Sequence, residues 1–91
     1  MKAKEILEII TKIDVNCSEN SCDIQTYKGD EPLYWSYCKE KQDNLNFALE
    51  VNLRKIISVY YRENNIKYDN TTWFVDDLAE LKELVKVKFK I

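Results

Sequence analysis

Apolar residues near the start of the chain recur with the spacing of a helix. The stripe runs from Ile6 to Ile13, and charged residues fill most of the positions between its members. It ends at Asp14, before the polar segment 15–22. This pattern predicts an amphipathic N-terminal helix followed by a polar loop.

The next part of the chain alternates apolar and polar residues with a period of two, which is typical of strands. Residues 22–28 predict one strand, and the stretch Gly29-Asp30-Glu31-Pro32 predicts a turn after it. Residues 33–39 predict a second strand and residues 45–52 a third, with the apolar set Leu45, Phe47, Leu49 and Val51. Three such strands form an antiparallel meander, and we expect the N-terminal helix to cover its apolar face.

The helical spacing returns at Asn52, a good N-cap, and the polar pair Asn64-Asn65 predicts the end of this second helix. A continuous helix from Leu45 is the alternative interpretation. It would place Asn46 and Asn52 inside the apolar stripe, so we favour the strand over residues 45–52.

A third helix is predicted to begin at Asn70 or at a following threonine. Its apolar stripe comprises Phe74, Leu78, Leu81 and Val85. The alternation of apolar residues and lysines over 85–91 predicts a short terminal strand. The expected fold is therefore one α+β domain with an N-terminal helix, a three-stranded antiparallel meander, two C-terminal helices and this terminal strand.

Composition narrows the class of function. The chain has 91 residues, no histidine and one glycine, so it lacks the commonest general base and any glycine-rich phosphate-binding loop. The segment 1–14 is not a secretory signal and no apolar run could span a bilayer. We therefore expect a cytoplasmic protein that is not an enzyme, uses no cofactor and contacts no membrane. The abundance of Lys, Asn and Ile is compatible with AT-rich coding, as in a low-GC bacterium or its phage, and the expected location is a bacterial host cell.

The cysteines Cys17, Cys22 and Cys38 are odd in number. A reducing cytoplasm predicts free thiols, with Cys17 and Cys22 in a polar loop. A structural zinc site needs four ligands, and without histidine a carboxylate would have to complete it. We therefore expect no metal.

The aromatic content, two Trp, six Tyr and three Phe, is high for a small core. Tyrosine and tryptophan are enriched in protein interfaces. The candidates for surface tyrosines are Tyr27, Tyr34, Tyr61 and Tyr68. We predict that acidic loop residues and two of these tyrosines contact a protein partner, namely Asp30, Glu31, Tyr34, Asp43, Tyr68 and Asp69.

A short pattern in the second half of the chain carries a resemblance. Its residues are Lys55, Ile57-Ser58, Tyr60, Tyr68-Asp69, Phe74, Asp76-Asp77-Leu78 and Leu81. Together with the α-β-β-β-α-α order, this pattern resembles a family of small phage anti-CRISPR proteins that block the type II-A RNA-guided DNA endonuclease. The resemblance implies an inhibitor that occupies the PAM-reading site with carboxylates in place of DNA. That family has a run of acids between its last two helices, where this chain has only Asp69.

Two other functions remain open. An immunity protein or antitoxin that blocks a toxin would have the same properties. A nucleic-acid-binding domain would use a basic face made of Lys39, Lys41, Lys82, Lys86, Lys88 and Lys90. The formal net charge of −2 is unfavourable for nucleic acid, so we expect a protein or nucleoprotein partner, an effector nuclease or a toxin.

Overall fold

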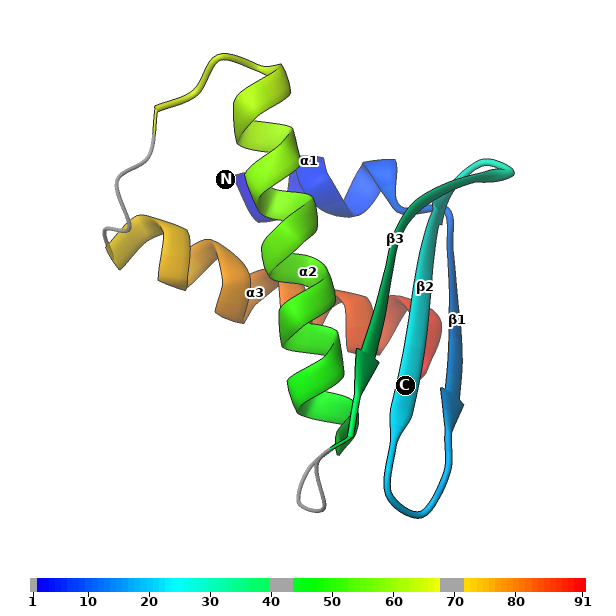
Figure 1. Cartoon of the computed structure of the whole chain (residues 1–91). Helices are drawn as coiled ribbons and strands as arrows, with labels where there is room; N and C mark the ends of the chain where they lie inside the picture. The colour runs from blue at the N-terminus through cyan, green and yellow to red at the C-terminus, as the bar shows by residue number, and fades with distance from the viewer. Residues whose placement is uncertain (1, 40–43, 68–71) are drawn as a thin grey trace.

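The computed structural model describes residues 2–39, 44–67 and 72–91, and it confirms the α+β fold and the α-β-β-β-α-α order (Figure 1). The helices and strands are α1 (Lys2–Ile9), β1 (Lys12–Cys17), β2 (Cys22–Lys28), β3 (Glu31–Cys38), α2 (Asn44–Glu63) and α3 (Thr72–Phe89). The three strands form one antiparallel sheet in the order β1-β2-β3. Helix α2 packs across β2 and β3, and α3 packs against α1 and α2.

The hairpin between β2 and β3 is the predicted turn. Lys28 pairs with Glu31, so only Gly29 and Asp30 form the loop. Gly29 has φ +62°, a conformation that costs glycine little because it has no Cβ. Pro32 lies on an edge strand beside a register shift, where no ladder hydrogen bond from its nitrogen is needed.

The first strand begins where the N-terminal helix was expected to continue. Helix α1 ends at Ile9, and Thr11 N donates to Tyr27 O at 2.9 Å, which starts the pairing with β2. The expected helix over 6–13 and loop over 15–22 are therefore wrong in their bounds, because residues 12–17 form β1. Its β-branched Ile13 and Val15 favour a strand.

The prediction of a strand over residues 45–52 is wrong, because these residues begin α2. Asn52 supplies the physical reason. Its side chain is fully buried, and its Oδ1 accepts a hydrogen bond from Thr26 Oγ1 at 2.8 Å. Its Nδ2 donates to Ile24 O at 3.2 Å and Tyr34 O at 3.1 Å. A buried amide is tolerated when its hydrogen bonds are made, so Asn52 occupies the apolar stripe and joins α2 to the sheet.

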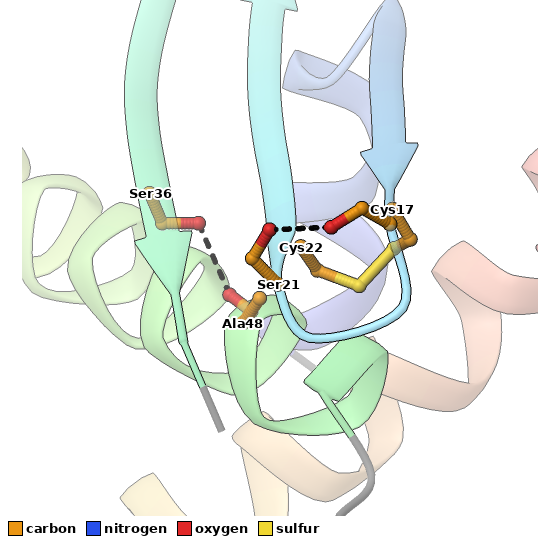
Figure 2. The surroundings of a disulfide bond; sticks show 6 residues. Cys17, Ser21, Cys22, Ser36 and Ala48 are labelled. Carbon is orange, nitrogen blue, oxygen red and sulfur yellow. Dashed lines mark hydrogen bonds between the residues drawn. A yellow bond between two sulfur atoms is a disulfide. The ribbon is translucent and has the colours of Figure 1, made fainter. Parts of the chain in front are cut away.

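The covered face of β3 carries small side chains. Ser36 and Cys38 are 4% exposed, and α2 comes close enough for Ser36 Oγ to donate to Ala48 O at 3.2 Å (Figure 2). Trp35 and Tyr37 alternate with these two residues and therefore lie on the opposite face.

The terminal strand over 85–91 is also absent, since α3 continues to Phe89. Lys90 has φ +55°, and Ile91 N donates to Lys86 O at 3.0 Å. A left-handed residue followed by such a bond is the Schellman end of a helix. Asn65 (φ +55°) ends α2 in the same way, as the pair Asn64-Asn65 predicted.

A disulfide joins Cys17 and Cys22 across the β1–β2 hairpin (Figure 2). The two residues are direct partners in the register, with Cα atoms 4.1 Å apart. The prediction of two thiols in a polar loop is therefore wrong, because pairing of β1 with β2 brings the sulfur atoms together. Cys38, the partner of Cys22 on β3, is a buried free thiol, as expected.

Candidate functional site

The structure places three of the six predicted contact residues. Asp30 is exposed in the β2–β3 turn, Glu31 is exposed at the start of β3, and Tyr34 is half-buried against the core. The other three, Asp43, Tyr68 and Asp69, lie outside the described residues. Of the other tyrosines expected at the surface, Tyr61 is fully buried, and its hydroxyl donates to the carboxylate of Asp77.

Glu31 and Tyr34 come together at a cavity of about 190 Å³ that α2 and the β2–β3 hairpin form. Its lining combines apolar and aromatic side chains with two lysines and two glutamates, all four of which are exposed. The residues that line it are Ile9, Lys28, Glu31, Leu33, Tyr34, Lys55, Ile56, Val59, Tyr60 and Glu63. The two lysines and two glutamates give the lining no formal net charge.

A hydrogen bond beside this cavity couples two titratable groups. Tyr60 OH donates to Glu5 Oε2. This bond lowers the pKa of Glu5, with a smaller contribution from the charge of Lys2. The same bond raises the pKa of Tyr60, because only the protonated hydroxyl can donate it, and loss of solvation and the negative charge of Glu5 add to this effect.

The second feature is the sheet face opposite α2, here called the open face, which no described helix covers (Figure 1). Trp35 and Tyr37 project from it and are 57% and 53% exposed. Their rings stack with centroids 6.2 Å apart and an interplanar angle of 21°. Trp35 Nε1 donates to Asp23 Oδ1 at 2.6 Å, which orients the indole. The open face therefore presents a stacked aromatic pair held by a carboxylate.

The register arranges the polar residues of the open face in rows. Asp14, Gln25 and Trp35 form one row across the three strands. Asp23 lies beside Trp35 and pairs with Tyr37 in the next row. These rows surround a shallow hollow of about 120 Å³. It is lined by Asp14, Asn16, Asp23, Gln25 and Trp35.

One cation of the protein already lies on the open face. Lys12 Nζ is 3.5 Å from Asp14 Oδ1 and 5.1 Å from the centre of the Tyr27 ring. Loss of solvation raises the pKa of Tyr27, and its hydrogen bond with Asp14 adds to this effect. Within the described residues, no basic side chain forms an ion pair with Asp23.

Because the predicted terminal strand is absent, the C-terminal lysines do not form a row along a strand. Lys86 and Lys88 lie on α3, where residues two positions apart point to different sides of the helix, and Lys90 follows the end of the helix. Lys88 Nζ donates to Leu7 O and Ile10 O, at 3.5 and 3.1 Å, so it caps the end of α1. Lys41 lies outside the described residues.

Sequence reasoning did not single out Trp35 and Tyr37 as surface contacts. Both faces of β3 carry aromatic or apolar residues, so alternation alone does not identify the covered face. The sequence signal for the covered face was the small size of Ser36 and Cys38, because small side chains let a helix pack closely on that face.

Comparisons with protein-family models, curated proteins and solved structures found no match to this chain. Among the residues described, no cluster of three His, Cys, Asp or Glu side chains could hold a metal ion. None of the helices, as far as they are described, is long and apolar enough to span a membrane.

Proposed function

We propose that this chain is a stoichiometric inhibitor that binds a bacterial protein or nucleoprotein complex and blocks its working site. The proposed target is the type II-A RNA-guided DNA endonuclease, which the resemblance over residues 55–81 implies. The alternative is that the chain is an immunity protein or antitoxin and that its target is a toxin.

The observation that carries this proposal is the exposed aromatic pair on the open face. Trp35 and Tyr37 leave more than half of their surface in water. Burying apolar area against a partner contributes about 25 cal/mol per Å² before the costs of association. Tryptophan and tyrosine are the residues most enriched among those that dominate binding energy, so this pair is suited to anchor a protein partner.

The acidic residues near the β2–β3 turn support an association role. Asp30 and Glu31 are exposed at the end of the sheet. Rim charges of this kind mainly raise the rate of encounter with a basic surface. A nuclease presents such a surface where it binds nucleic acid.

The test is a titration of the purified chain against a reconstituted type II-A endonuclease with its guide RNA. DNA cleavage should fall in proportion to added chain and stop near equivalence, and the chain should co-purify with the complex. Inhibition to the same extent by the double variant Trp35→Ala/Tyr37→Ala should need at least about tenfold more protein. The reason is that each anchor contributes roughly 1 kcal/mol or more to the binding free energy.

The matched control is Phe47→Ala, which removes an aromatic ring that is 49% exposed on α2. It should inhibit within about twofold of the wild type, as expected for an exposed ring outside the interface. Failure to form a stable complex with any candidate endonuclease or toxin would overturn the proposed function. Equal inhibition by the double variant and the wild type would overturn the role of the open face.

A further inference from the structure

The hollow on the open face has the chemistry of a cation receptor. One wall is the indole of Trp35, and the carboxylates of Asp14 and Asp23 stand at its edge. Trp35 Nε1 uses Asp23 Oδ1, and a carboxylate has a second oxygen that can accept further hydrogen bonds. Asp23 therefore has acceptor capacity next to an aromatic ring.

The row of Lys12 and Tyr27 shows a similar arrangement of ring and carboxylate with a cation in place. There, Lys12 Nζ lies between the Asp14 carboxylate and the Tyr27 ring. Beside Trp35, the carboxylate of Asp23 comes from the adjacent row, and no basic side chain of the described residues pairs with it. The missing component is a cation from outside the chain.

We infer that this hollow binds an arginine side chain of the protein partner, with the guanidinium stacked on Trp35 and hydrogen-bonded to Asp23. The inference rests on the proposed protein-binding function and specifies the chemistry of the partner. A guanidinium is planar, always charged and carries only donors. It therefore matches a flat ring beside carboxylate oxygens, as arginine commonly does over tryptophan.

Two other occupants fit this hollow less well. A lysine ammonium carries the charge but lacks the planar group that stacks on an indole. A nucleic acid would stack a base on Trp35, but its phosphates would lie near Asp14 and Asp23, where like charges repel. Arginine suits both the ring of Trp35 and the carboxylate of Asp23.

The test uses three capped pentapeptides of glycine and alanine that differ only in a central arginine, lysine or citrulline. Binding is followed by the NMR signal of the Trp35 indole N–H, assigned with Trp35→Phe. The arginine peptide should shift this signal saturably. The lysine peptide should bind about threefold or more weakly, and citrulline, which has the shape without the charge, should give no saturable shift.

The variant Asp23→Asn keeps an oxygen that can accept from Trp35 Nε1, but it removes the charge and replaces the second carboxylate oxygen with an NH2 donor. It should weaken the arginine peptide about three- to fivefold, as an exposed ion pair allows. Asp30→Asn changes the net charge equally but lies in the β2–β3 turn, and it should leave the affinity unchanged.

Equal binding of the arginine and lysine peptides would overturn the inference, and so would equal effects of Asp23→Asn and Asp30→Asn. A Trp35 shift that follows the concentration of the chain itself would identify a second copy as the occupant and would also overturn it. Saturation by a single-stranded oligonucleotide but not by the peptide would identify nucleic acid instead. Because the peptides need no target protein, failure here is distinct from failure of the endonuclease titration.

Discussion

Replacing Asn52 with alanine tests the contact that positions the sheet on α2. The buried amide bonds to Thr26 Oγ1, Ile24 O and Tyr34 O. Nδ2 has two hydrogens and Oδ1 accepts one bond here, so three hydrogen bonds are lost. At about 1 kcal/mol each, the free energy of unfolding should fall by roughly 3 kcal/mol. The whole free energy of unfolding of a chain of this length is about 5–14 kcal/mol. The loss should therefore lower the melting temperature by about 12–20 °C.

Urea unfolding followed by circular dichroism measures this loss directly. Arg54→Ala, at an exposed position of the same helix, is the matched control and should change stability by less than about 0.5 kcal/mol. Asn52→Leu should also destabilise the protein, because the hydroxyl of Thr26 and two carbonyl oxygens would face an apolar group. A leucine variant as stable as the wild type would refute the role given to the amide.

Three further predictions concern contacts elsewhere in the fold. Tyr60→Phe should raise the pKa of Glu5 toward its ordinary value in a carboxyl NMR titration. Because the pKa of Glu5 is lowered in the folded state, the contact stabilises above the unfolded pKa and this stabilisation is lost as pH falls; the two proteins should therefore converge in melting temperature at acid pH. Reduction of Cys17–Cys22 should cost about 2 kcal/mol, as expected for a short loop, and Cys17→Ser should abolish the response to reductant in a thermal melt. Lys88→Met should lose about 1 kcal/mol in urea unfolding, because the cap on the carbonyl oxygens of α1 is removed.

The parts of the fold that the sequence predicted correctly depend on local signals. Strand β2 follows from its alternation, the β2–β3 turn from Gly29, and the end of α2 from the pair Asn64-Asn65. For the turn and the helix end, the residue's own conformational preference decides the outcome. Such preferences can be recognised without knowing what packs against them.

Residues 45–52 show where local signals fail. Leu45, Phe47, Leu49 and Val51 alternate, but Phe47 and Val51 are 49% and 36% exposed while Leu49 is buried. The stabilising group is Asn52, whose partners on β2 and β3 are distant in the sequence. A buried amide is favourable only when those partners are in place, and no local pattern contains them.

The candidate site was predictable only in part for the same reason. Glu31 and Tyr34 were singled out, and both line the cavity beside α2. The pair Trp35 and Tyr37 was missed because the covered face of β3 depends on the position of α2. Sequence composition indicated an aromatic surface, and the fold determines which residues form it.

Hydroxyl-radical footprinting of the chain alone and with the type II-A endonuclease–guide RNA complex tests the central claim most directly. Oxidation of Trp35 and Tyr37 should fall strongly in the complex, while oxidation of Phe47 should stay the same. A stable complex in which Trp35 and Tyr37 remain as reactive as in the free chain would contradict the assignment of the open face as the binding surface.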